Sequence, residues 1–182
     1  MPHIKPLLPD DAPAAAKDIY EEFSRRMGFT SPPNFIMTQG HAQTVARGSW
    51  ELVRNVLVTG TIERWIKEMV FVAISKDRNC QYCTAAHIAC CRMLGVDPRL
   101  LENLVRDVNS IPNQKLRDMI LFGLKCARHP QSISEADCET LRSHGLGQPE
   151  ILELIAMSGL AVYANIMADA TGMEADASFA GN

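Results

Sequence analysis

The sequence predicts an all-α protein, and three observations support this fold class. Apolar residues recur at helical spacing in one segment after another, capping residues, glycines and prolines separate these segments, and alternating strand patterns do not recur. The strand-like run MVFVAI (69–74) continues the helical pattern of ERWIKE without a breaker, and a lone strand would leave its backbone groups unpaired. With 182 residues, 47% of them hydrophobic, the chain can form a packed core.

Helix signals begin near the amino terminus. Asp10 or Asp11 is expected to cap a first helix, which has Pro13 in its opening turn. Gly28 is expected to end this helix, and the SPPN segment at 31–34 then predicts a rigid connector. A further helix is indicated by apolar residues at helical spacing, namely Trp50, Val53, Val56 and Leu57.

Two helices follow in the centre of the chain. Thr59 or Thr61 is expected to cap the first of them, which fades at 75–78. Asn79 is expected to cap the second, which ends before Gly95. Because the connection between them is short, the two helices should pack antiparallel.

The second half of the chain continues the helical pattern. Ser134 and Asp137 resemble a capping box with Asp in place of Glu. Pro149 opens a long final helix, which is expected to run to about Ala170 and to be closed by Gly172. An earlier helix, in the segment 113–129, has an apolar side formed by Leu116, Ile120, Leu121 and Leu124.

A faint internal repeat relates the two halves. The segment HGLGQPEILELI (144–155) parallels RMLGVDPRLLENL (92–104), although the second half has no CxxC. A spacing of roughly 50 to 60 residues lies outside the common solenoid periods, which indicates a degenerate duplication within one domain. The chain of 1–182 is accordingly a single helical domain with an N-terminal arm (1–40), a core containing the CxxC motif (45–105) and a second helical repeat (110–172).

Charge and hydropathy limit the expected partners. A net charge of -3 without any cluster of Lys and Arg excludes nucleic acid and anionic lipid. The N-terminal stretch lacks a secretory signal, and the apolar run 154–164 falls short of the roughly 18 residues of a membrane span. We therefore expect a soluble, cytoplasmic protein. Thiols are kept reduced in that compartment, so six cysteines with one CxxC indicate redox or metal chemistry.

The segment 68–87, EMVFVAISKDRNCQYCTAAH, contains the candidate site. At about 100° per residue, Cys80, Cys83 and His87 fall within a helical stripe roughly 60° wide, so two thiols and an imidazole share one face. A position near the helix start favours the reactive thiolate, and His87 is placed to take or return a proton. Glu68 lies on the preceding helix, which the antiparallel return can bring beside this face.

Other interpretations of these residues remain open. The two motif cysteines can be small buried apolar residues, and Glu68 can be solvated or part of an ordinary salt bridge. A bridge between Cys80 and Cys83 needs local adjustment, because Cβ atoms three residues apart on a helix are about 5 to 6 Å apart. The remaining cysteines are interpreted as packing residues, namely Cys90, Cys91, Cys126 and Cys138. Three histidines have no partner at ligand spacing, namely His41, His129 and His144.

Zinc and thioredoxin-like chemistry are the rival interpretations. Four potential zinc ligands follow one another in the sequence, namely Cys80, Cys83, His87 and Cys90. One unbroken helix spreads them along about 15 Å, so they cannot all surround one ion. No βαβ pattern surrounds the CxxC, as a thioredoxin-like motif requires. We therefore expect neither a metal nor an organic cofactor.

The motif of this segment is Glu68, then eleven residues, then the pattern C-x-x-C-x-x-x-H. It resembles the core of the AhpD-like alkylhydroperoxidase and carboxymuconolactone decarboxylase superfamily. Within that superfamily the chain resembles the peroxidase-related branch. The resemblance implies an all-helical homo-oligomer with a two-cysteine peroxidase cycle. In that cycle Cys83 would be the peroxidatic thiol, Cys80 would resolve its sulfenic acid, and Glu68 with His87 would relay protons. Tyr82 departs from the pattern, since better-studied members have histidine there.

The expected function is therefore reduction of alkyl or hydrogen peroxides, with electrons from an unidentified dithiol or protein reductant. The alternatives are a non-redox lyase of the decarboxylase type, whose members generally lack the CxxC, and an inactive helical interaction module. Peroxide turnover that requires Cys83 distinguishes the first function from the other two.

Overall fold

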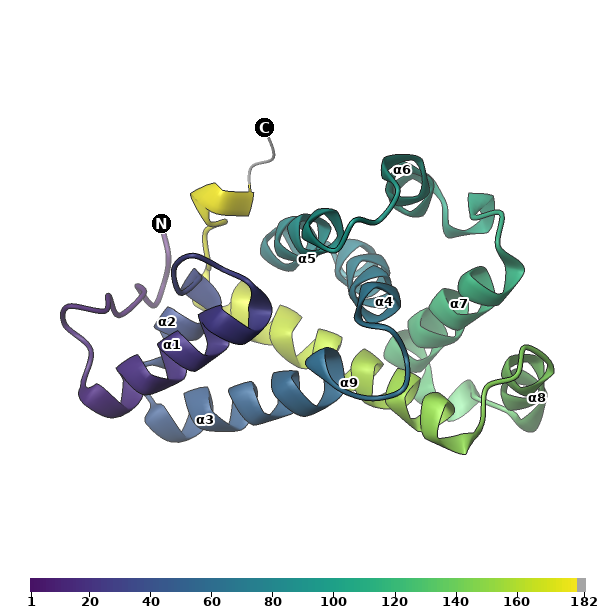
Figure 1. Ribbon diagram of the computed structural model, residues 1–182, viewed down its shortest axis with the longest axis horizontal. Helices are drawn as coiled ribbons and strands as arrows, with labels where there is room; N and C mark the ends of the chain where they lie inside the picture. The colour runs from purple at the N-terminus through teal and green to yellow at the C-terminus, as the bar shows by residue number, and fades with distance from the viewer. Residues whose placement is uncertain (180–182) are drawn as a thin grey trace.

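The computed structural model describes residues 1–179, and within this range the chain forms nine α-helices and no strand (Figure 1). The predicted all-α fold class is confirmed. The α-helices are α1 (Ala14–Met27), α2 (Asn34–Gln39), α3 (Gln43–Leu52), α4 (Arg64–Asp77), α5 (Gln81–Met93), α6 (Pro98–Arg106), α7 (Gln114–Arg128), α8 (Glu135–Ser143) and α9 (Gln148–Thr171). A π-helical segment, Val53–Val58, extends α3, and short 3-10 turns are Val108–Ser110, Pro130–Ser132 and Ala177–Phe179.

Helix α4 is the centre of the molecule. It packs against α5, α7 and α9, and four apolar side chains along it, Met69, Val70, Val72 and Ile74, are fully buried. A helix that is apolar on all sides is stable only where neighbours cover every side. Helices α1, α2 and α3 pack on one another at one end of the molecule, and α2 also contacts α9 (Figure 1). The amide of Phe35 on α2 donates to the hydroxyl of Tyr82 on α5.

Several predicted caps differ in the structure. Asn79 does not cap α5; its φ of 59° places it in the left-handed region, and Cys80 is the N-cap. Asparagine tolerates this conformation, which lets the amide of Cys80 bond to the carbonyl of Ser75 and turn the chain sharply. Pro13 takes the N-cap position of α1 that was expected for Asp10 or Asp11.

The start of α4 is also different from the prediction. Neither Thr59 nor Thr61 caps it, because the helix begins after Glu63. Thr61 instead binds the carboxylate of Glu153 through its amide and its hydroxyl, each at 2.6 Å. Both donors of Thr61 are therefore engaged by α9 rather than by α4.

Helix ends elsewhere follow the sequence. The Ser134–Asp137 capping box forms at the start of α8. Gly28 and Gly172 end α1 and α9 with φ of 89° and 63°, values that favour glycine. Leu121 is the exception on α7, because it is exposed rather than part of the apolar side.

A buried ion pair joins α9 to α4. The Lys67 side chain is fully buried, and its Nζ lies 2.8 Å from Glu153 Oε2. The same Nζ donates to the carbonyls of Val56 at 2.9 Å and Thr59 at 2.5 Å. All three Lys67 donors are satisfied, as a buried ammonium requires.

Helix α9 is the longest of the fold. By length and composition it alone, within residues 1–179, is apolar enough to cross a membrane, and half of its most apolar window is buried in the protein. The apolar run 154–164 was expected to be too short for a membrane span, but it is part of this longer apolar helix. One side of α9 packs on α4 and α7, and the opposite side faces outward.

Candidate active site

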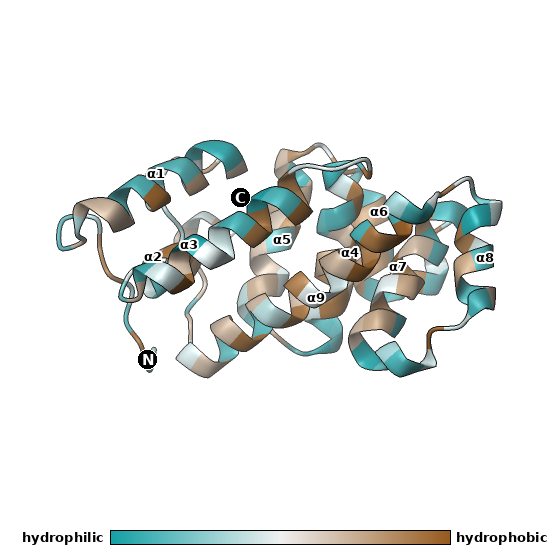
Figure 2. Cartoon of the chain, turned by 90° about the horizontal axis from the view of Figure 1, so that it is seen from below, coloured by the Kyte–Doolittle hydropathy of each residue, from teal (hydrophilic) through white to brown (hydrophobic). Residues whose placement is uncertain are grey.

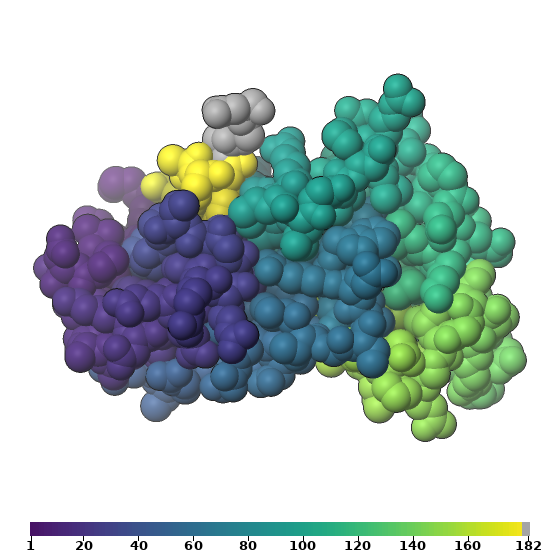
Figure 3. Space-filling view, viewed as in Figure 1, coloured from purple at the N-terminus to yellow at the C-terminus, as the bar shows by residue number. Residues whose placement is uncertain are grey.

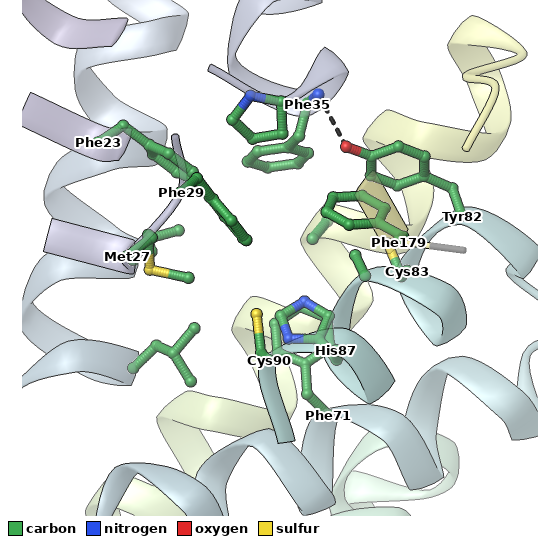
Figure 4. Close-up of a pocket in the computed structure, with 15 residues that line it drawn as sticks. Phe23, Met27, Phe29, Phe35, Phe71, Tyr82, Cys83, His87, Cys90 and Phe179 are labelled. Atoms are coloured by element: carbon green, nitrogen blue, oxygen red, sulfur yellow. Dashed lines mark hydrogen bonds between the residues drawn. The ribbon is translucent and has the colours of Figure 1, made fainter. Parts of the chain in front are cut away.

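A small aromatic cavity lies where α5 meets the N-terminal helices and the C-terminal turn (Figure 4). Its volume is about 40 Å³, enough to admit water. The wall is apolar except for four side chains with titratable groups, Tyr82, Cys83, His87 and Cys90. The other lining residues are Phe23, Met27, Phe29, Pro33, Phe35, Val53, Leu57, Phe71, Ala86, Ala164 and Phe179.

The two motif cysteines lie at the start of α5 as free thiols. Cys80 is fully buried, whereas Cys83 is 2% exposed and lines the cavity. The hydrogen bond with Cys80 raises the pKa of Cys83, and burial raises it further. The expectation that the helix start favours the thiolate is therefore not met at Cys83, where the protonated thiol is favoured. A base is needed to ionise it.

His87 and Glu68 form the pair that the antiparallel packing predicted. Glu68 is fully buried on α4, and its Oε2 lies 2.5 Å from Nδ1 of His87 on α5. The His87 ring also stacks on Phe71, with ring centroids 3.4 Å apart and an angle of 16° between the planes. With Nδ1 held by the carboxylate, Nε2 is the ring nitrogen available to a reactant in the cavity.

Arg64 is a site residue that the sequence analysis missed. Its Nε donates to Glu68 Oε1 at 3.0 Å, and its guanidinium also approaches the carbonyl of Met27 at 3.3 Å. Glu68 therefore does take part in a salt bridge, but it is buried and also holds His87, so the solvated alternative is wrong. The i, i+4 spacing of Arg64 and Glu68 on one helix was the available signal.

Cys90 was expected to be a packing residue, but it lines the cavity. Its Sγ and ligand atoms of Glu68 and His87 all lie within 4.8 Å of one another. Burial raises the pKa of Cys90, and the negative charge of Glu68 raises it further. The three donor types suit zinc, but Arg64 already neutralises Glu68 and its positive charge opposes a cation there. The arrangement is better suited to moving protons.

Asn165 of α9 is a second residue that the sequence analysis missed. It is fully buried, its Nδ2 donates to Ser75 Oγ at 2.9 Å, and its amide lowers the pKa of Cys83. Within residues 1–179 its Oδ1 has no hydrogen-bond partner. A buried amide on an apolar helix was the signal in the sequence, because such groups need a polar neighbour.

Tyr82 fastens the C-terminal segment over the cavity. Its hydroxyl donates to Asp176 Oδ2 at 2.8 Å and accepts from the amide of Phe35 at 3.0 Å. Phe179 packs edge-on against its ring, and Figure 3 shows this segment in yellow between the purple N-terminal helices and teal α5. Burial, followed by the charge of Asp176, raises the pKa of Tyr82, so it does not act as a base.

Residues outside the cavity mostly have structural roles. Cys126 is buried on α7 and Cys138 is half-buried on α8, as packing residues are. His144 has no partner at ligand spacing in the sequence, and in the structure its Nε2 lies 2.8 Å from Asp118 Oδ2. The two residues are 26 positions apart, so no local spacing could reveal the pair.

Comparisons with known proteins agree with this architecture. No family model matches the chain. A stretch of 85 residues is 29% identical to an alkyl hydroperoxide reductase of Mycobacterium tuberculosis, covering 47% of this chain and 24% of that protein. A peroxidase-related protein from Silicibacter sp. TM1040 is 28% identical over 100% of this chain and 95% of its own, with a TM-score of 0.87. The fold of the chain is AhpD-like.

Two further structures share the AhpD-like fold. The "alkylhydroperoxidase AhpD core", an uncharacterized peroxidase-related protein of Ralstonia eutropha JMP134, has a TM-score of 0.89 at 24% identity, covering 98% of this chain and 94% of its own. The debrominase Bmp8 has a TM-score of 0.81 at 18% identity, covering 97% and 93%. These likenesses establish the fold alone. The curated relative is matched over about a quarter of its length, so its activity remains a property of that protein.

Proposed function

We propose that this AhpD-like chain is a thiol-dependent peroxidase that reduces organic or hydrogen peroxides through Cys83 and Cys80. One observation carries the proposal: Cys83 and His87 line the same apolar cavity, and Glu68 holds the imidazole by its far nitrogen. A thiol with a raised pKa needs a positioned base at neutral pH, and His87, one helical turn away, is that base. Arg64 keeps the Glu68 carboxylate paired in this buried environment.

The first half of the cycle consumes the peroxide. His87 Nε2 takes the proton of the Cys83 thiol, and the thiolate sulfur attacks the terminal oxygen of the hydroperoxide. A sulfur–oxygen bond forms as the oxygen–oxygen bond breaks. The departing alkoxide takes the proton back from His87 and leaves as an alcohol. Cys83 is then a sulfenic acid, oxidised by two electrons, and the peroxide has been reduced by two.

The second half restores the thiols. The Cys80 sulfur attacks Sγ of the Cys83 sulfenic acid, water leaves with one proton from Cys80, and a Cys80–Cys83 disulfide forms. A dithiol reductant opens this disulfide by two exchange steps and becomes a disulfide itself. The effect of the Cys80 thiol on the pKa of Cys83 supports this order, because it requires the two thiols to be neighbours at the start of α5.

Turnover measurements test the proposal. Purified protein is given cumene hydroperoxide or hydrogen peroxide together with dithiothreitol or dihydrolipoamide, and peroxide loss is followed. Wild type and Cys126→Ser, a buried control outside the cavity, should turn over at similar rates, while Cys83→Ser should be inactive. No peroxide consumption by wild type with any donor would overturn the proposal. Lactone turnover that survives Cys83→Ser would indicate the lyase instead.

A further inference from the structure

A second hollow opens beside the aromatic cavity of the candidate active site. Its volume is about 270 Å³, whereas that of the aromatic cavity is about 40 Å³. The two share Phe29 and Phe179, whose ring centroids are 5.9 Å apart, and Figure 4 shows both rings at the wall of the aromatic cavity. These rings therefore separate the cavity from this outer hollow, which lies between residues 28–31, Ala89, Arg92 and Met93 of α5, and residues 178–179.

One row of side chains on α5 connects the two spaces. Residues three apart on a helix are offset by about 60° and rise about 4.5 Å, so every third residue follows a slow spiral around the helix. Cys83 and Ala86 line the aromatic cavity, and the next two members of the row, Ala89 and Arg92, line the outer hollow. The middle of this row consists of two alanines, so small side chains border the passage between the reactive thiol and the arginine.

The two volumes decide how an organic hydroperoxide can be accommodated. A space of ~150 Å³ is known to take one benzene ring, so the aromatic cavity can admit a peroxide group but not an aryl or alkyl body beside it. The outer hollow is large enough for such a body. An organic hydroperoxide would therefore lie across both spaces, with its peroxide toward Cys83 and His87 and its organic part between the rings of Phe29 and Phe179.

The charge of the outer hollow is positive. Arg92 is the charged side chain among those that line it, and Thr30 and Ser31 add hydroxyl groups. Within residues 1–179 the Arg92 guanidinium has no ion-pair partner, in contrast to Arg64, which is held by Glu68. The last turn of α1, which precedes residues 28–31, carries two more arginines, and Figure 2 shows this end of α1 in teal. A guanidinium in such a place suits a carboxylate, which it can bind through two parallel hydrogen bonds.

We propose that the outer hollow binds the organic part of a hydroperoxide that carries a carboxylate, with Arg92 on the carboxylate and the peroxide between Cys83 and His87. This inference rests on the proposed peroxidase function and names its substrate class. The Cα atoms of Cys83 and Arg92 are about 13 Å apart along α5, a span that an aryl or medium-length acyl body can bridge. Two-electron reduction would convert this hydroperoxy acid into the corresponding hydroxy acid, and the second peroxide oxygen would leave as water when the Cys80–Cys83 disulfide forms.

Turnover of a matched pair of substrates tests the role of Arg92. The pair is cumene hydroperoxide with a para-carboxylate and the methyl ester of the same compound, which differ in charge at one end only. Wild type should prefer the carboxylate, and Arg92→Gln should lower the carboxylate-to-ester ratio of kcat/KM by about 5- to 10-fold. Arg99→Gln removes the same charge from an exposed position of α6 and should keep the wild-type ratio. An unchanged ratio in Arg92→Gln, or equal losses in both variants, would overturn the inference.

A binding measurement separates this inference from the peroxidase function. The probe is the tertiary alcohol that corresponds to the para-carboxylate substrate, because it keeps the carboxylate and the ring but has no oxygen–oxygen bond to reduce. Calorimetric titration should show binding to wild type and to Arg99→Gln, and a dissociation constant raised about 5- to 10-fold in Arg92→Gln. Binding with this dependence on Arg92 would support the site even if no peroxide were consumed. No binding to wild type would overturn the inference, and reduction of uncharged cumene hydroperoxide would then leave the peroxidase function standing.

Discussion

Glu68→Gln is the substitution that separates the two roles of the buried carboxylate, which are to stabilise protonated His87 and to form a structural ion pair with Arg64. Gln keeps the size and one hydrogen-bond acceptor but removes the charge that lies beside His87 and Arg64. When His87 takes the Cys83 proton it becomes an imidazolium, and two opposite unit charges with centres about 4 Å apart attract each other by ~4 kcal/mol at an effective dielectric constant of ~20. Because Arg64 already offsets part of this charge, we expect a loss of about 10²- to 10³-fold in turnover at pH 7.

The pH profile of this variant distinguishes a base from a structural residue. Cys83 has a raised pKa, so its thiolate fraction near neutrality depends on assistance from His87. As the pH rises, more Cys83 ionises without help, and the deficit of Glu68→Gln should shrink. A profile that overlays wild type at every pH would refute the reasoning and remove Glu68 from the mechanism.

Stability needs a matched control, because Glu68 is fully buried and pairs with a cation. Removing one partner of such a pair commonly costs ~3 to 5 kcal/mol, although the retained Gln amide and the partial exposure of Arg64 reduce this cost. Glu153→Gln breaks the comparable pair with buried Lys67 outside the cavity. It should lower the melting temperature and leave turnover at 25 °C unchanged, whereas Glu68→Gln should lower both.

Three further predictions follow from other contacts. Burial alone would raise the pKa of Glu153, but hydrogen bonds, first from Lys67, lower it to about 2. Because the pKa of Glu153 is lower in the folded state, this carboxylate stabilises the protein above pH ~4.5. On the order of 3 kcal/mol of unfolding free energy is lost as the pH falls towards 2. Glu153→Gln should flatten this pH dependence of the unfolding free energy, measured by urea titration. Tyr82→Phe should release Asp176 and speed alkylation of Cys83 measured by mass spectrometry, and an unchanged rate would contradict the clasp. Cys80→Ser should react once with peroxide and leave a dimedone adduct on Cys83, and an adduct-free protein would argue against the assigned nucleophile.

The fold was predictable because its signals are local. The Ser134 capping box, the final glycine of α9 at Gly172 and the helical spacing of apolar residues each depend on a few neighbouring positions. The caps that failed depended on longer contacts. Thr61 is drawn to Glu153, 92 residues away, and Asn79 takes a left-handed conformation that the return of α5 onto α4 requires.

The candidate site was predictable only in part. Glu68 and His87 could be paired from helical spacing and one short connection, and the structure brings them together. Asn165 is 82 positions beyond Cys83, and no periodicity connects the two residues. Cys90 shares a helix with His87, yet only the packing of α1 and the C-terminal turn makes its environment a cavity. Enclosure is a tertiary property, so a sequence pattern alone does not reveal it.

The composition of the cavity explains why the paired carboxylate would matter for the proposed reaction. Tyr82 has both its hydroxyl contacts occupied, and the raised pKa values of Cys83 and Cys90 keep both thiols protonated. Among the lining side chains this leaves Nε2 of His87 as the acceptor for the Cys83 proton. An imidazolium formed in so apolar a cavity would be costly without a fixed anion behind it. Glu68, buried and held by Arg64, is that anion, so the acid–base capacity of the site resides in the contact between α4 and α5.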